Sequence, residues 1–246
     1  MAMQVNNHGR TFDVPRKTRT TSRNISLAAG VLYLLTFVSI PIAFLYTPVR
    51  DVNYLIGPGP DTAVISGAIL ELVVALAGIG TAVALYPVVK RQNEAFALGF
   101  VGTRTLEAGT IFAGVVCLMA IVTLRKSGAG AEALVTGRAL IAMYDWFHLG
   151  QNLIPALNAV LLGSLLYRAG LVPRVLPVLG FIAAPLLVAN TILLMFGVTG
   201  PALTLTTLGV IPIAVWELSL GVWLVVKGFY ATPLTAAFDQ MEAVPE

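Results

Sequence analysis

The sequence has 246 residues, of which 57% are hydrophobic and only 11% charged, and its mean hydropathy is +0.87. A soluble domain carries about a quarter charged residues, so this chain has too few charges to cover a water-facing surface. The net charge of +3 does not indicate nucleic acid binding, because the basic residues gather at the ends of apolar stretches, as charge-directed membrane insertion predicts. We therefore expect an integral membrane protein whose main partner is the lipid bilayer.

The N-terminal segment is polar and basic, and we expect residues 1–24 to form a flexible cytoplasmic tail. The apolar stretch that follows, Ile25–Tyr46, is too long for the hydrophobic region of a typical signal peptide and lacks a small-residue cleavage pattern. This stretch is therefore predicted to be the first membrane span.

About 20 mostly apolar residues are needed to cross the hydrocarbon core as a helix. Several stretches reach this length, and none shows the alternation of a barrel strand. We therefore expect an all-α bundle of six transmembrane helices over residues 25–227, followed by a short cytoplasmic tail over residues 228–246. The stretches are Ile25–Tyr46, Ala63–Val88, Ala95–Leu124, Ala139–Tyr167, Val175–Val198 and Leu203–Val226.

Lysine and arginine are unevenly divided between the two sides of these spans, and this asymmetry predicts that both termini are cytoplasmic. The side of the N-terminal tail holds Arg10, Arg16, Lys17, Arg19, Arg23, Lys90, Arg91, Arg168, Arg174 and Lys227. The opposite side holds Arg50, Arg125, Lys126 and Arg138.

Small residues inside the spans suggest packing roles. Gly78, Gly80, Gly109 and Gly114 are expected to allow close approach between helices. Cys117 has no cysteine or histidine at a metal-binding spacing, and we expect it to be an apolar packing residue.

Ionisable side chains inside the spans are the candidates for function. Each charge at mid-bilayer costs roughly 2.5–3.5 kcal/mol, so such residues should face the bundle interior and find partners. A shared polar core is the simplest arrangement. The residues are Glu71, Arg104, Glu107, Asp145, His148 and Glu217.

Their spacing supports this interpretation. Arg104 and Glu107 are three residues apart and can pair on one helix face. Asp145, His148 and Asn152 are spaced three and four and also share a face, although Asp145 lies towards the outer end of its span. Because four acids accompany one permanent base, either some carboxyls are protonated or a cation lies among them. The candidate ligand-binding cluster is Glu71, Arg104, Glu107, Asp145, His148, Asn152 and Glu217.

Three functions remain open. The cluster could bind or transport a proton, a cation or a small polar ligand, which predicts a polar path. It could belong to an intramembrane enzyme using the acids and His148, which predicts a cavity beside them. Zinc, iron or manganese would suit such ligands, but the sequence has no HExxH motif and indicates no particular cofactor or catalytic residue. The third function is structural, which predicts a dry, fully paired cluster.

Several motifs along the chain resemble one known family. They are Tyr86–Ala95, Arg104–Ala108, Asp145-Trp146, Ala156–Ala159, Leu165–Arg174, Leu176–Gly180, Trp216–Gly221 and Lys227-Gly228-Phe229. On these motifs the chain resembles the bacterial membrane family catalogued as domain of unknown function 4386. The resemblance implies a multi-pass protein of the bacterial inner (plasma) membrane and supplies no list of catalytic residues.

Overall fold

A computed structural model describes residues 19–242, except residues 41, 52, 58, 129 and 199–201. Most of the predicted N-terminal tail, residues 1–18, lies outside the described residues. Within these ranges the chain is helical and has no strand. The α-helices are α1 (Arg19–Thr36), α2 (Ile42–Leu45), α3 (Asp61–Val89), α4 (Glu94–Lys126), α5 (Ala133–Ala169), α6 (Val175–Met195), α7 (Ala202–Val226) and α8 (Pro233–Glu242). The short 3-10 helices are η1 (Phe37–Ser39), η2 (Pro48–Arg50) and η3 (Gly130–Glu132).

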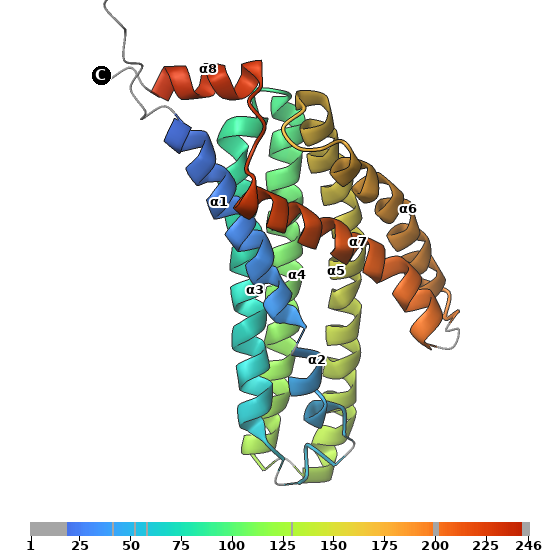
Figure 1. Ribbon diagram of the computed structural model, residues 1–246. Helices are drawn as coiled ribbons and strands as arrows, with labels where there is room; N and C mark the ends of the chain where they lie inside the picture. Colours follow the sequence, from blue (N-terminus) through green and yellow to red (C-terminus); the bar gives the residue numbers. More distant parts are fainter. Residues whose placement is uncertain are drawn as a thin grey trace, which may run out of the picture.

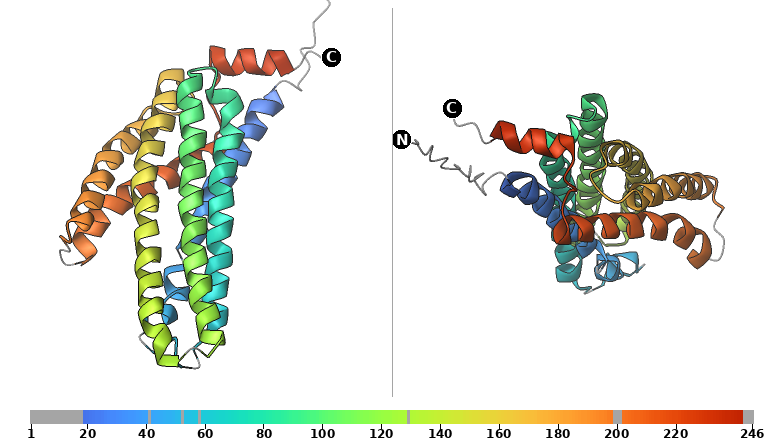
Figure 2. Two further views of the ribbon diagram at one scale, coloured as in Figure 1. Left: turned by 180° about the vertical axis from the view of Figure 1, so that it is seen from behind. Right: turned by 45° about the horizontal axis from the view of Figure 1, so that its top comes forward.

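Six of these helices, α1 and α3 to α7, are long and apolar enough to cross a membrane. They form a ring in which each helix packs against the next along the chain and α7 returns to α1. The long helices α3, α4 and α5 run side by side, whereas α6 and α7 splay away from α5 (Figures 1 and 2). We call the end where α1 begins and α7 finishes the terminal end. The opposite end, which carries the segment between α2 and α3, is called the loop end.

The predicted first span, Ile25–Tyr46, is wrong as one continuous helix. Helix α1 ends at Thr36, and η1 and the short α2 follow. The sequence explains the break, because Pro41 has no N–H to donate to the carbonyl of Phe37. The Ile40 N–H donates to that carbonyl instead, at 3.1 Å. This break separates α1 from η1 and α2, which contribute Phe37, Ser39 and Ile42 to the walls of two cavities.

The other spans differ from their predictions mainly in length. Helices α3, α4 and α5 extend beyond the apolar stretches into polar sequence. The start of α4 is capped by Asn93, whose side chain accepts a hydrogen bond from the Phe96 N–H at 3.0 Å. The tail after α7 contains α8, which lies across the terminal end (Figure 1) and accepts a hydrogen bond from the Ser22 hydroxyl at the Asp239 carboxylate.

Glycine contacts show how closely the ring packs. A Cβ on Gly80 would lie 3.1 Å from Leu32, and one on Gly114 would lie 3.2 Å from Tyr144, as close approach predicts. Gly109 has nothing within 4 Å of the position of a Cβ, so the prediction is wrong there. Gly30 approaches the backbone of another helix, because a Cβ there would lie 2.8 Å from the backbone nitrogen of Val225.

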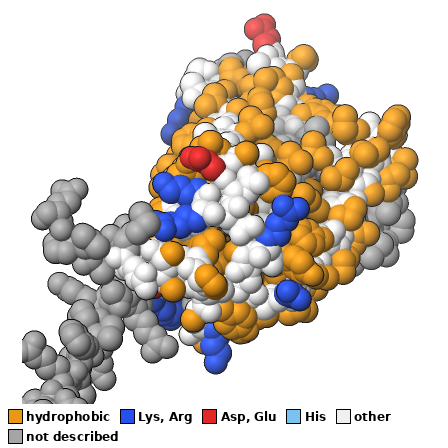
Figure 3. Space-filling view, turned by 90° about the horizontal axis from the view of Figure 1, so that it is seen from above, with side chains coloured by type: hydrophobic (Ala, Val, Ile, Leu, Met, Phe, Trp, Pro, Cys, Tyr) orange, Lys and Arg blue, Asp and Glu red, His pale blue; other side chains and the backbone are white. Residues whose placement is uncertain are grey.

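Large apolar side chains cover the outside of the ring. Leu76, Leu106 and Val116 are each more than half exposed, on α3 and α4. Lipid tolerates such a surface, whereas water would drive it to associate. Cys117 is buried among apolar side chains, as predicted. Seen from the terminal end, several Lys and Arg side chains are spread over the face, with apolar side chains between and outside them (Figure 3).

Candidate functional site

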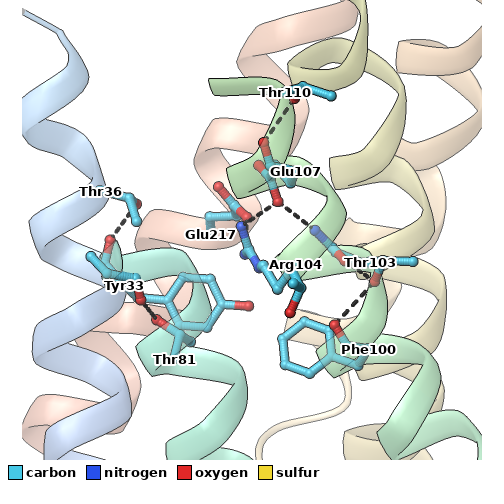
Figure 4. Close-up of polar contacts among 12 residues, drawn as sticks. Tyr33, Thr36, Thr81, Phe100, Thr103, Arg104, Glu107, Thr110 and Glu217 are labelled. Atoms are coloured by element: carbon cyan, nitrogen blue, oxygen red, sulfur yellow. Dashed lines mark hydrogen bonds and ion pairs between the residues drawn. The ribbon is translucent and has the colours of Figure 1, made fainter. Parts of the chain in front are cut away.

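Arg104 is the centre of a buried ionic cluster formed by α4 and α7. Its side chain is 4% exposed. The guanidinium donates to Glu107 Oε2 at 3.0 Å and to Glu217 Oε1 at 2.6 Å (Figure 4). The predicted pairing of Arg104 with Glu107 is therefore confirmed, and the glutamate of the last span completes it. We call Arg104, Glu107 and Glu217 the arginine cluster.

Neighbouring helices hold the arginine cluster in place. Asn158 on α5 donates from its amide to Glu107 Oε2 at 2.8 Å, and Thr103 donates to the Asn158 carbonyl oxygen. The rings of Tyr33 and Phe100 lie 5.2 Å and 5.8 Å from the guanidinium carbon. A cation so close to aromatic rings is stabilised by the ring quadrupoles, more strongly when water is excluded. The arginine is thus fixed by α1, α4, α5 and α7 together.

A cavity of about 260 Å³ adjoins the arginine cluster. Arg104, Glu107 and Glu217 line it, together with His148 and Asn152 of α5. The side of the cavity nearest α1 is formed by the residues of the helix break, and α7 supplies an apolar wall. We call this the central cavity. Two carboxylates for one guanidinium give its polar wall a surplus negative charge when both acids are ionised.

Glu71 belongs to a second polar group and does not contact the arginine cluster through any hydrogen bond or ion pair among the described residues. Its two oxygens accept hydrogen bonds from the hydroxyls of Tyr46, at 3.1 Å, and Tyr144, at 2.9 Å. His148 Nε2 lies 3.9 Å from Glu71 Oε1 and 3.4 Å from the Tyr144 hydroxyl. We call Glu71, Tyr46, Tyr144 and His148 the tyrosine cluster. The single shared core predicted from sequence is therefore two clusters.

A second cavity, of about 230 Å³, lies against the tyrosine cluster. Glu71, Tyr46 and Tyr144 line it, and Arg50 lines it towards the loop end. We call it the outer cavity. His148 lines both cavities, so this histidine stands between the two carboxylate groups.

Two ion pairs lie in the half of the bundle that includes the loop end. Arg50 contacts Asp145 at 2.6 Å, with both side chains about half exposed, so Asp145 is a rim residue as its position in the sequence suggested. The hydrogen bond to Asp145 raises the pKa of the Arg50 guanidinium, against the effect of burial. Arg125 pairs with the Asp61 carboxylate and donates to the Gly57 carbonyl at 2.8 Å. Burial, followed by the hydrogen bond to Asp61, raises the pKa of Tyr54 to about 12.

The predicted site residues thus divide among three places. Arg104, Glu107 and Glu217 meet, Glu71 lies with His148, and Asp145 lies at the rim. Asn152 lines the central cavity. Among the described residues, no three His, Cys, Asp or Glu side chains gather as a metal site. Sequence reasoning missed Tyr46 and Tyr144, because tyrosine is common in apolar spans and carries no charge that must find a partner.

The fold and the two clusters define an all-helical bundle with six helices long enough to cross a membrane and ionisable side chains held inside it. The family model described as Domain of unknown function (DUF4386) matches residues 28–228, and the chain belongs to this family. No curated protein and no solved structure shows significant similarity to the chain.

Proposed function

We propose that the chain is a multi-pass protein of the bacterial inner membrane that binds a small hydrophilic cation, the proton included, in the central cavity. Membrane insertion is supported by six apolar helices and by their exposed apolar side chains. The excess of lysine and arginine at the terminal end supports termini in the cytoplasm.

The observation that carries the binding proposal is an open cavity beside a buried, charged cluster. Glu107 and Glu217 share one arginine, and both line the cavity. Carboxylates that are not fully neutralised in a low-dielectric site either take up a proton or attract a cation. The volume of about 260 Å³ is several times the roughly 30 Å³ that a water molecule occupies in the liquid. The cavity therefore has room for a small organic cation or a hydrated ion.

A purely structural role has less support. A cluster that only holds helices together should be dry and fully paired, whereas this one borders a cavity. The Arg104 Nε is buried and has no hydrogen-bond partner within the described part of the chain. A site that receives a ligand or water is consistent with both features.

An intramembrane enzyme is also less supported. His148 lies in the tyrosine cluster, and its Nδ1 is 3.3 Å from the backbone carbonyl of Tyr144 in its own helix. The ion pairs bring it near Glu71, whereas Glu107 and Glu217 pair with Arg104. His148 does line the central cavity with Glu107 and Glu217, as an intramembrane enzyme requires, but its direct contacts in the described ranges are with Glu71 and Tyr144 and not with those two acids.

The test is ligand-dependent stability of the full chain purified in detergent. Sodium, potassium, ammonium, methylammonium and tetramethylammonium chlorides would be added between pH 5 and 9, with ionic strength kept constant by N-methylglucamine chloride. A cation that binds only the folded state raises the unfolding free energy by about 2.7 kcal/mol at 100 times its Kd. We expect at least one cation, or the proton, to raise Tm in the wild type.

The test variant is Glu217→Gln, in the arginine cluster. The control variant is Glu132→Gln, in the exposed helix η3. Glu217→Gln should abolish the rise in Tm, and Glu132→Gln should leave it unchanged. If no probe cation and no pH change affects the wild type differently from Glu217→Gln, the binding proposal is wrong.

A further inference from the structure

The two cavities share part of their walls. Ser39, His148 and Gln151 line both of them, as do two apolar residues of α3 and α4. Ser39 is exposed, and the His148 side chain is 37% exposed. The boundary between the cavities is therefore made largely of polar, partly accessible side chains and not of close-packed apolar ones.

The outer cavity leads towards the loop end. Arg50 lines it, and the side chains of the Arg50–Asp145 ion pair next to it are about half exposed. An exposed ion pair of this kind contributes little to stability, about 0–1 kcal/mol. So weak and exposed a contact does not close the outer cavity on the side of Arg50.

The terminal side of the arginine cluster is closed. Phe100 precedes Arg104 by one helical turn and is fully buried, and Tyr33 and Leu220 are fully buried beside it. These residues belong to the main apolar core, which fills the terminal half of the ring. A polar solute has an apolar barrier on that side and polar walls on the other.

Glu71 lies along the open side. The residue is 5% exposed and lines the outer cavity. Its carboxylate accepts hydrogen bonds from two tyrosine hydroxyls. Four charged or titratable residues line the outer cavity with Glu71: Tyr46, Arg50, Tyr144 and His148. Asp145 pairs with Arg50, and the adjacent central cavity is lined by Arg104, Glu107 and Glu217. Two phenol donors orient this carboxylate without neutralising it.

We infer that the two cavities form one water-accessible half-channel, entered from the loop end beside Arg50. In this half-channel the Glu71 carboxylate attracts cations before they reach the arginine cluster. The inference rests on the proposed function for the identity of the final site. The ligand class is thereby narrowed to hydrophilic cations that arrive from water at the loop end, not from the lipid and not from the terminal end.

Cysteine labelling tests this route without knowledge of the ligand. Cys117 is the only cysteine and is buried, so Cys117→Ala gives a background for single cysteines. The test site is Gln151→Cys at the junction of the cavities. Leu157→Cys, on the exposed apolar face of the same helix, and Thr81→Cys, in the buried terminal half, are controls.

The reagents are two membrane-impermeant methanethiosulfonates of similar size, one with a trimethylammonium group and one with a sulfonate. Ser127→Cys and Ala231→Cys mark the loop end and the terminal end, because both are exposed residues there. In sealed vesicles, Gln151→Cys should react only when the reagent is on the side that labels Ser127→Cys. Its rate should exceed the rates at Leu157→Cys and Thr81→Cys by about tenfold or more, because the charged reagents enter neither lipid nor a packed core.

Charge selectivity tests the role of Glu71. The ratio of cationic to anionic labelling rates at Gln151→Cys should exceed the ratio at Ser127→Cys by about tenfold or more, since a narrow site lined by one sign of charge concentrates counter-ions. Glu71→Gln should remove most of this excess. Tyr144→Phe alters the same hydrogen-bond group but keeps the carboxylate, so it should retain the excess and control for local distortion.

Several outcomes would overturn the half-channel. They are labelling of Gln151→Cys no faster than Thr81→Cys, labelling from the side of Ala231→Cys, and a rate ratio that Glu71→Gln leaves unchanged. Each of these outcomes can occur while the cation-dependent rise in Tm persists, so failure of the route is distinguishable from failure of the proposed function.

Discussion

Arg104 on α4 and Glu217 on α7 are in direct contact, with Nη2 2.6 Å from Oε1, although 113 residues separate them in the sequence. Both side chains are largely buried, at 4% and 16% exposed. Helices α4 and α7 are not neighbours in the ring, so this ion pair ties opposite parts of the bundle together across its interior.

The pair should therefore show strong energetic coupling. Arg104→Met should lower the free energy of unfolding by about 3–5 kcal/mol, because two buried carboxylates lose their counter-charge. Combining it with Glu217→Gln should cost less than the sum of the single changes, with a coupling energy of about 1–3 kcal/mol. Unfolding in mixed detergent micelles measures all four proteins of the cycle. Strict additivity would contradict a direct ionic contact.

Asn158 and Asn152 lie on the same helix and provide a matched comparison. Asn158 is fully buried and donates to the Glu107 carboxylate at 2.8 Å. Asn158→Ala should destabilise the protein by about 1.5–3 kcal/mol, the usual contribution of a hydrogen bond to a charged group. Asn152→Ala, at a position that lines the cavity, should cost less than about 0.5 kcal/mol. Thermal unfolding of both variants checks this, and equal losses would contradict the assignment of Asn158 to the arginine cluster.

Gly30 fixes the approach of α1 to α7. A Cβ there would lie 2.8 Å from Val225 N and 2.9 Å from Gly221 O, both backbone atoms that cannot rotate away. Gly30→Ala should therefore cost about 1–3 kcal/mol through forced separation of the helices. Gly102→Ala, where nothing lies within 4 Å, should be neutral or stabilise α4 by up to about 1 kcal/mol. The Tm values of the two variants and the wild type measure this difference. A Gly30→Ala variant with the wild-type Tm would show that α1 and α7 lie farther apart.

Arg125 and Arg50 should differ sharply in their tolerance of lysine. Arg125 contacts Asp61 through two nitrogens, donates to the Gly57 carbonyl and lies 5.3 Å from the Tyr54 ring centroid. Lysine reproduces neither the planar fork nor the ring contact, so Arg125→Lys should speed amide hydrogen exchange in the segment before α3.

Arg50→Lys is the control for that experiment, because the Arg50–Asp145 pair is about half exposed and contributes about 0–1 kcal/mol. Hydrogen exchange near Gly57 should stay at the wild-type rate in this variant. Faster exchange in Arg50→Lys than in Arg125→Lys would reverse our assignment of which arginine holds the segment.

Much of the helical fold could be predicted from sequence, because the apolar stretches and their length depend on composition along one helix at a time. The break after Thr36 was not predicted, although Pro41 is visible in the sequence, because prolines are tolerated within many membrane helices. Helix α8 was also not predicted, because its apolar content is too low for a membrane span. Its position depends on contacts with other elements, such as the Ser22–Asp239 hydrogen bond.

The candidate site was only partly predictable. Spacing of three residues on one helix fixed the Arg104–Glu107 pair, because helical geometry alone brings these side chains together. The partners from other helices, Glu217 and Asn158, depend on how each helix is rotated and where it crosses its neighbours. No spacing within a single helix contains that information.

The sequence by itself indicated that lipid suits the outside of the helices, that the chain is helical and that buried charges must find partners. These conclusions follow from composition and from the cost of placing charge in lipid. Only the tertiary structure decided that the charges form two clusters, that Tyr46 and Tyr144 hold Glu71, and that cavities lie on one side while apolar packing closes the other. The physical reason is that partner choice among buried side chains depends on distances between helices, and these are set by the packing of the whole ring.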